Sequence, residues 1–293
     1  MKILLAADIF PPETGGPATY VVTLANELVK AGDEVKVVSL NPHSDQSSVK
    51  CQVSSVAVKS KMFRYLQYFW LLWKHAKGTD VVYAMGPVNA GLPALIAARL
   101  RRKKFVVKVV GDYAWEQGVQ RFGVSVGIDE FQKMEVKLPW PVRLLRAVQR
   151  FVCRQSDSVI VPCRYLARMV ADWGVVVKEN VMVIYNAHNF TTVAPMVKLP
   201  EQQWIISVGR LVSWKGMDTL IKLMPEIVAK YPQAKLKIVG DGPEIEKLRS
   251  LVNDANLAEA VEITGGKPHN EAMAYIRASN VVVLNSAYEG LSH

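Results

Sequence analysis

The sequence predicts an α/β protein made of two doubly wound domains, each a parallel sheet covered by helices. Short β-branched runs alternate with longer amphipathic stretches, which is the pattern of parallel strands joined by helices. The periodicity lapses in a polar, proline-bearing stretch, and a second alternating series follows it. A chain of 293 residues, 50 % of them hydrophobic, can bury two such cores. We therefore expect an N-terminal domain over residues 1–190, a linker over 191–203 and a C-terminal domain over 204–293.

The elements of the first domain follow from the spacing of its apolar residues, with Gly32 and Gly174 as helix stop signals. We expect a long loop over residues 117–138, where the segments above strand ends commonly carry specificity. Strands are expected at residues 2–7, 34–40, 53–58, 80–84, 105–110, 158–161 and 181–184, and helices at 16–31, 62–77, 89–101, 141–155 and 164–173.

The second domain is shorter in sequence and ends soon after a predicted buried strand. A buried parallel strand needs helices on both faces of its sheet, and no helical pattern follows this one. We therefore expect the second domain to be incomplete and the chain to be truncated at its C-terminus, with a natural small domain as the alternative. Its strands are expected at residues 204–208, 235–239, 261–264 and 280–284, and its helices at 217–230, 244–253 and 270–278.

The composition limits which partners the protein is expected to bind and in which compartment it is expected to lie. The formal charge is +10, which favours nucleotide phosphates, nucleic acid or acidic lipid headgroups without choosing among them. The three cysteines have no CxxC spacing, so neither a disulfide framework nor a zinc site is expected. The first apolar run is too short for a signal peptide, and no run approaches the length of a spanning helix. We expect a cytoplasmic protein.

The sharpest motif runs from Ser207 to Gly216, where a predicted strand ends at Gly209 and two cations precede a helix. Ligands of doubly wound sheets bind beyond the carboxyl ends of the strands. Arg210 can make a forked contact with phosphate oxygens, and Lys215 adds a compact charge beside a helix N-terminus. Together they would hold a diphosphate, whereas the plainer interpretation is two solvated loop cations.

Two glycine-rich turns also join a strand to a helix. One contains Gly240 and Gly242 in the run GDGPE, and the other contains Gly15 and Gly16 in PPETGGPA. Either turn could be purely structural. Neither is a GxGxxG fingerprint, and no GK[ST] occurs, so the sequence does not support a dinucleotide oxidoreductase or a phosphate-loop ATPase.

These motifs, taken in order with Asn186 after a strand and the run NSAYEGLS near the end, resemble the retaining glycosyltransferases of family 4, also called group 1. The resemblance spans the whole chain. It implies the GT-B architecture, in which two Rossmann-like domains face a cleft and a nucleotide sugar binds to the C-terminal one. It also implies donor contacts at Gly15, Gly16, Gly209, Gly240, Gly242, Gly266, Lys267, Gly290 and Leu291.

The resemblance further implies catalytic roles. Arg210 and Lys215 would neutralise the departing nucleotide diphosphate, the electrostatic role that dominates when phosphate leaves. Glu289 looks like the first carboxylate of the family's E-x7-E motif, whose second carboxylate would fall beyond His293, so we expect weak donor binding. Many relatives carry a histidine at the end of the strand expected at residues 105–110. This chain has no histidine there, and Asp112 follows the strand instead. Asp112 could contact the donor sugar or take the acceptor proton, or it could simply cap the next turn.

No histidine pair has a metal-binding spacing and no Asp-x-Asp occurs, so we expect chemistry without a metal or other cofactor. An aromatic helix over residues 61–74 either turns a stripe toward the core or lies at a membrane surface. The stripe consists of Leu66, Phe69, Trp70 and Trp73. In the second case Phe63 and Leu72, with Tyr65, would form its outer side, and a basic helix at residues 143–154 would assist it.

The sequence thus predicts a hexosyltransferase that uses a nucleotide diphosphate sugar and a hydroxyl acceptor, such as a sugar or a lipid-linked acceptor. The front-face mechanism implied by the family would retain the anomeric configuration. A sugar-nucleotide 2-epimerase of the same fold and a non-catalytic nucleotide-sugar binder remain as alternatives. Nucleic acid is not expected as a partner, because no regular basic and aromatic array occurs. An anionic membrane surface is expected as a partner.

Overall fold

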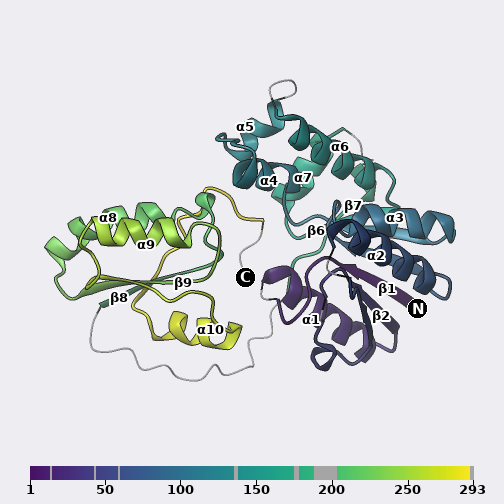
Figure 1. Ribbon diagram of the computed structural model, residues 1–293, viewed down its shortest axis with the longest axis horizontal. Helices are drawn as coiled ribbons and strands as arrows, with labels where there is room; N and C mark the ends of the chain where they lie inside the picture. The colour runs from purple at the N-terminus through teal and green to yellow at the C-terminus, as the bar shows by residue number, and fades with distance from the viewer. Residues whose placement is uncertain are drawn as a thin grey trace. The chain divides into compact units, whose positions relative to one another are not determined.

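The computed structural model describes residues 1–13, 15–42, 44–58, 60–134, 138–174, 178–187 and 203–290. The chain forms two compact units, Met1–Ala187 together with Gly290–His293, and His188–Glu289. Each unit has a parallel sheet of its own (Figure 1), so the predicted fold class is confirmed. Gly290 groups with the first unit, whereas the sequence assigned it to the second domain. The expected linker lies almost entirely outside the described residues.

The first unit contains a seven-stranded sheet in the order β3-β2-β1-β4-β5-β6-β7, with every pairing parallel. The order reverses between β1 and β4, the kind of point at which such sheets bind ligands. The strands are β1 (Lys2–Ala7), β2 (Glu34–Ser39), β3 (Gln52–Ser55), β4 (Val81–Met85), β5 (Lys104–Lys108), β6 (Ser158–Val161) and β7 (Val181–Val183). The helices are α1 (Gly16–Lys30), α2 (Lys61–Ala76), α3 (Gly91–Leu100), α4 (Tyr113–Arg121), α5 (Ile128–Lys133), α6 (Trp140–Arg154) and α7 (Arg164–Asp172).

The central strand β1 is buried on both faces, as its continuous apolar run requires. Alternate residues of the strand point to opposite sides of the sheet. Leu5 and Ala7 pack with Val21 and Ala25 of α1, while α2 covers β1 and β2 through other residues. The sheet is therefore a layer between helices. Its faces are covered, so the carboxyl ends of its strands remain open to a ligand.

The second unit contains a four-stranded sheet in the order β10-β9-β8-β11, again with parallel pairings. Its core lies between the sheet and α8 and α9, around Ile221, Leu236, Ile238 and Leu248. The strands are β8 (Gln203–Val208), β9 (Ala234–Val239), β10 (Val261–Ile263) and β11 (Val281–Val282), and the helices are α8 (Met217–Lys230), α9 (Ile245–Asp254) and α10 (His269–Ala278).

Two predictions about single elements are wrong. The segment 117–138 contains the end of α4 and all of α5, and these helices are short enough that their apolar spacing gave no clear helical signal. The strand expected at 280–284 is not buried, because β11 is an edge strand whose Val281 and Val282 are 51 % and 49 % exposed.

The aromatic helix α2 matches neither expectation in full: Phe63 and Tyr65 are exposed as the membrane alternative expected, but Leu72 is buried. Tyr68 and Leu72 face the core, whereas Leu66, Trp70 and Trp73 are exposed together with Phe63 and Tyr65. The helix carries apolar residues on both sides, so hydrophobicity alone did not identify the buried one. Its outer surface is aromatic.

Candidate functional site

The carboxyl edge of the second sheet gathers three loops that the sequence had singled out. They follow β8, β9 and β10, and backbone hydrogen bonds join them in series. The Leu211 amide donates to the Asp241 carbonyl (2.8 Å), and the Gly240 amide donates to the Gly265 carbonyl (3.0 Å). This edge is where a doubly wound sheet presents backbone amides to a ligand.

Two of the glycines are needed for the close approach of these loops. A Cβ atom at Gly240 would lie 1.8 Å from the carbonyl oxygen of Gly209, and one at Gly242 would lie 2.3 Å from that of Leu211. Any larger residue would force the backbones apart. The glycines therefore set the shape of the edge, which is a structural role that does not depend on a ligand.

Lys215 and Glu289 meet at this edge. The Lys215 ammonium forms an ion pair with Glu289 Oε1, which also accepts a hydrogen bond from Ser286 Oγ (2.6 Å). The side chains are only 17 % and 30 % exposed, so the pair is partly shielded from water. A cation and a carboxylate held side by side can contact the two ends of a ligand that is anionic at one end and rich in hydroxyls at the other.

The loop that bears Glu289 is fixed to the loop that bears Lys215. Asn285 Nδ2 donates to the Gly216 carbonyl (3.1 Å), and the Ala287 amide donates to the Trp214 carbonyl (2.8 Å). Gly216 has φ 64° and precedes α8, where a Cβ would lie 2.5 Å from Asn285. The left-handed conformation and this contact both require glycine.

The remaining predicted residues of the second unit lie in the loops after β8, β9 and β10. Arg210 is exposed one residue after Gly209. Lys267 forms an ion pair with Glu271 of α10 (3.0 Å), which raises the pKa of Lys267. Gly266 lies against Asp241, 3.4 Å from where its Cβ would be. The second unit thus brings Gly209, Arg210, Lys215, Gly240, Gly242, Gly266, Lys267 and Glu289 to one edge.

The other predicted donor residues belong elsewhere or fall outside the description. Gly15 and Gly16 begin α1 in the first unit, where the Gly15 carbonyl accepts from the Thr19 amide (3.1 Å). Gly290 groups with the first unit, and Leu291 lies outside the described residues.

Asp112 has the capping role that the sequence offered as an alternative to catalysis. It is fully buried and caps α4, and its Oδ1 accepts from the Trp115 amide (3.0 Å) and from Gln149 Nε2 (2.9 Å). Its Oδ2 accepts from Gln132 Nε2 (2.8 Å). A carboxylate enclosed in this way does not face a substrate, so the geometry favours a structural role.

The sequence reasoning missed a polar cluster at the carboxyl edge of the first sheet. Asn89 Nδ2 donates to Asp8 Oδ2 (3.4 Å) and to the Tyr113 hydroxyl (3.0 Å), and the Tyr65 hydroxyl donates to Asn89 Oδ1 (3.0 Å). Burial raises the pKa of Asp8 to about 6. Asp8 directly follows β1, so the strand-end argument used for Gly209 would have found it.

A second unpredicted group is Lys108, the last residue of β5. It is 2 % exposed, and its ammonium lies 3.2 Å from the centroid of the Tyr20 ring and donates to Asn186 Oδ1 (2.6 Å). Burial lowers the pKa of Lys108 to about 7.

Models of known protein families match both halves of the chain. Residues 15–187 match the model of the glycosyl transferase 4-like domain, and residues 194–293 match that of glycosyl transferases group 1. The chain belongs to this glycosyltransferase family. The resemblance inferred from the motifs is confirmed.

Relatives in this family match over nearly the whole chain. A phosphatidylinositol N-acetylglucosaminyltransferase component of Arabidopsis thaliana is 22 % identical over 99 % of the chain, which spans 63 % of that protein. An α-monoglucosyldiacylglycerol synthase of Streptococcus pneumoniae is 21 % identical over 99 % of the chain, which spans 67 % of it. The Anabaena HepE structure in complex with UDP and glucose has a TM-score of 0.69 at 17 % identity, covering 98 % of this chain and 74 % of that one. That likeness confirms the GT-B fold.

Two features are absent from the residues that the structure describes. No helix among them is long and apolar enough to cross a membrane. Within the same residues no group of three or more His, Cys, Asp or Glu side chains could hold a metal ion.

Proposed function

We propose that the protein transfers a hexosyl unit from a nucleotide diphosphate sugar to a hydroxyl acceptor, with retention at the anomeric carbon, in the synthesis of cell-surface glycans or glycolipids. The proposal rests chiefly on the ion pair of Lys215 and Glu289 at the carboxyl edge of the second sheet, with Arg210 in the same loop as Lys215. Family membership supports the transferase class.

The chemistry assigned to these residues follows from their charges. The bond between the anomeric carbon and the diphosphate oxygen breaks, and the acceptor oxygen forms a new bond on the same face of the sugar. The acceptor proton passes to the departing phosphate oxygen. Arg210 and Lys215 stabilise the negative charge that grows on the diphosphate. Lys215 acts more strongly because it is held in place and partly shielded from water. Glu289 accepts hydrogen bonds from the sugar hydroxyls.

In this proposal the donor replaces a contact that already exists. Lys215 is held by Glu289, so its ammonium is in position before the diphosphate arrives. Because the donor must displace Glu289 from this ammonium, the carboxylate and the diphosphate compete for it. We propose that the reaction needs no metal, because the two cations supply the charge that a divalent ion would otherwise provide.

The acceptor is proposed to be a sugar or a membrane lipid, on the example of the phosphatidylinositol and diacylglycerol named in two relatives. We propose that the protein works on the cytoplasmic side at an anionic membrane surface. The exposed aromatic side of α2 supports this location. Failure to bind anionic vesicles at low salt would argue against it.

The transfer reaction can be tested with UDP-, GDP- and ADP-linked hexoses, each incubated with phosphatidylinositol or a diacylglycerol in detergent and with EDTA. Nuclear magnetic resonance of the product would report the anomeric configuration. Retention with EDTA present is expected, and an inverted product or a requirement for added metal would contradict the mechanism. Consumption of the donor without acceptor, giving an epimer, would identify the epimerase alternative instead.

A further inference from the structure

Helix α6 exposes a row of large apolar side chains that the fold does not bury. Its inner side holds Val142, Gln149 and Val152, all of which are fully buried. Its outer side carries Trp140, Leu144 and Phe151, which are 75 %, 56 % and 50 % exposed. At 100° per residue these three positions fall within about 40° of one another. They form one continuous outer stripe, which an ordinary surface helix would not carry.

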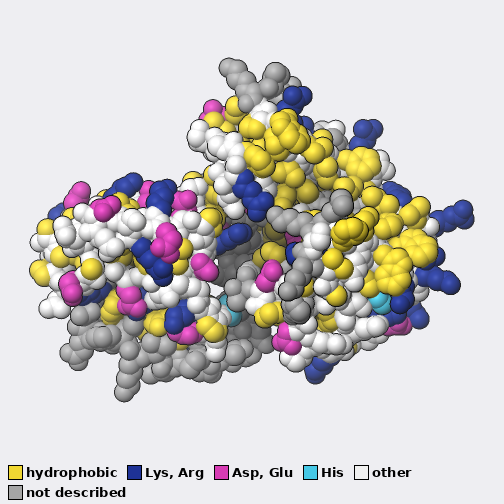
Figure 2. Space-filling view, in the orientation of Figure 1, with side chains coloured by type: hydrophobic (Ala, Val, Ile, Leu, Met, Phe, Trp, Pro, Cys, Tyr) yellow, Lys and Arg dark blue, Asp and Glu magenta, His cyan; other side chains and the backbone are white. Residues whose placement is uncertain are grey.

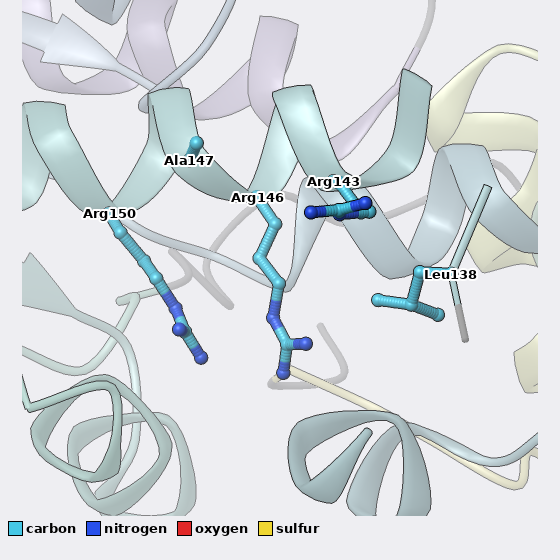
Figure 3. Close-up of a pocket in the computed structure, with 5 residues that line it drawn as sticks. All are labelled: Leu138, Arg143, Arg146, Ala147 and Arg150. Carbon is cyan, nitrogen blue, oxygen red and sulfur yellow. The ribbon is translucent and has the colours of Figure 1, made fainter. Parts of the chain in front are cut away.

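A row of arginines runs beside this stripe. Arg143, Arg146 and Arg150 extend from one side of α6 (Figure 3), and with Leu138 and Ala147 they line a pocket of about 220 Å³. Arg143 is exposed, Arg150 is half-buried and Arg146 is buried. Guanidinium groups therefore line the pocket from its rim to its floor.

Arg146 forms a fixed floor. Its Nη2 donates to the carbonyl oxygens of Phe131 (3.1 Å) and Gln132 (2.9 Å), and its Nη1 donates to that of Met134. These carbonyls close the C-terminal end of α5, where a cation is favoured by the helix dipole. The guanidinium carbon also lies 4.9 Å from the centroid of the Phe131 ring. These contacts hold the guanidinium in a fixed place at the floor of the pocket.

The other two arginines have charge and donors to offer. Neither Arg143 nor Arg150 forms an ion pair with any residue that the structure describes. Arg150 Nε is buried, and no acceptor in the described parts of the chain bonds to it. Buried donors are nearly always paired in folded proteins. A guanidinium row of this kind suits the oxygens of a phosphate group.

The surfaces next to the pocket indicate which kind of molecule carries that phosphate. Helix α3 contacts both α2 and α6, so the exposed residues of α2 and α6 belong to one layer of the first unit. Figure 2 shows hydrophobic side chains gathered over this region with Lys and Arg at their edges. The Arg101 guanidinium lies 3.7 Å from the Trp73 ring, and the Lys74 ammonium lies 5.1 Å from that of Trp70. Aromatic rings flanked by cations are typical of surfaces that lie in a bilayer interface.

We propose that the α6 pocket, lined by Arg143, Arg146 and Arg150, binds the phosphate of an anionic phospholipid while Trp140, Leu144 and Phe151 enter the bilayer interface. This inference rests on the membrane location proposed above and names the residues that read the headgroup. A choline headgroup carries a cation next to its phosphate, which the arginines repel. The pocket therefore prefers lipids with a net negative charge.

The test measures partition onto vesicles of phosphatidylcholine alone or mixed with phosphatidylglycerol. Arg143→Gln with Arg150→Gln should weaken binding to the mixed vesicles about thirty-fold, equal to about 2 kcal/mol at about 1 kcal/mol per interfacial cation. Lys230→Gln with Arg249→Gln removes the same charge from exposed positions of the second unit and should change binding less than about two-fold. Trp140→Gln with Phe151→Gln should weaken the binding that remains at high salt.

The outcomes separate the pocket from the rest of the account. Equal loss in the arginine pair and its control would overturn the pocket and leave only general charge attraction. Stabilisation of the protein by inorganic phosphate, with no difference between the two vesicles, would make this a site for a free anion and would also overturn the proposal. Absence of binding to any vesicle would reject both the pocket and the membrane location. Calorimetric titration with nucleoside diphosphates tests the transferase site independently, since these variants should not affect it.

Discussion

Lys215 and Glu289 lie 74 residues apart in the sequence and form an ion pair at the carboxyl edge of the second sheet. The pair links the loop after β8 to the loop after β11. If the diphosphate of a donor binds to Lys215, then Glu289 competes with it for the same ammonium. The two residues should therefore affect nucleotide binding in opposite directions.

Replacement of each member in turn tests this relationship. Lys215→Ala should weaken the binding of the preferred nucleoside diphosphate at least ten-fold, because a cation on phosphate is lost. Glu289→Gln should leave that binding equal or tighter, because Lys215 is no longer neutralised. Isothermal titration calorimetry measures both. Lys247→Ala, which removes an exposed lysine paired with Glu244, is the matched control. Equal weakening by both site variants would contradict the competition.

The close approach of the loops after β8 and β9 predicts the effect of one added methyl group. Gly240→Ala should lower the free energy of unfolding by about 3 kcal/mol, because the new Cβ collides with the carbonyl oxygen of Gly209. Gly78→Ala is the control, since nothing lies within 4 Å of its Cβ position, and it should change stability by less than about 0.5 kcal/mol. Urea unfolding would show the difference, and a stable Gly240→Ala would mean that the loops pack less tightly.

Asp112 should matter for folding more than for turnover. In Asp112→Asn the new amide would face Gln132 Nε2, and Gln132 has little freedom to turn because its Oε1 accepts from Trp173 Nε1 (2.9 Å). An unpaired buried donor should cost about 2 kcal/mol of stability. Turnover of the folded protein should fall less than about three-fold. A hundred-fold loss of turnover at unchanged stability would restore the catalytic role.

Lys108 should make stability depend on pH. Its pKa is lowered from 10.5 to about 7 by burial, so between these values the unfolded chain binds more protons than the folded one. Stability should therefore rise with pH from about 7 upward, by at most about 1.4 kcal/mol per pH unit. Lys108→Met should remove this rise in urea titrations at pH 7 to 9. An unchanged slope in the variant would show that another group causes it.

The motifs at the ends of strands were the part of the site that was easiest to predict from the sequence. Gly209, Arg210 and Lys215 could be placed at one edge because parallel strands end at the same edge of a sheet. Glu289 was found through the family resemblance. The fold class followed from the same alternation of strands and helices. The observed ends of individual strands differ from the predicted ends by a few residues, because local sequence patterns do not define strand ends sharply.

Burial was harder to predict, because it depends on contacts between distant segments. Asp112 is enclosed by Gln132 and Gln149, which come from two later helices. Lys108 is covered by Tyr20 and Asn186, from opposite ends of the first unit. No local pattern marks a charged residue that later becomes buried. The outward aromatic side of α2 was missed for a related reason, since both of its sides are apolar.

The central claim is that Arg210 and Lys215 hold the diphosphate of a sugar donor. Calorimetric titration of UDP-, GDP- and ADP-linked hexoses onto the protein and onto Arg210→Ala tests it most directly. The account predicts that one of the donors binds and that Arg210→Ala weakens its affinity at least ten-fold. Absence of binding by every donor, or binding that Arg210→Ala leaves unchanged, would contradict the account.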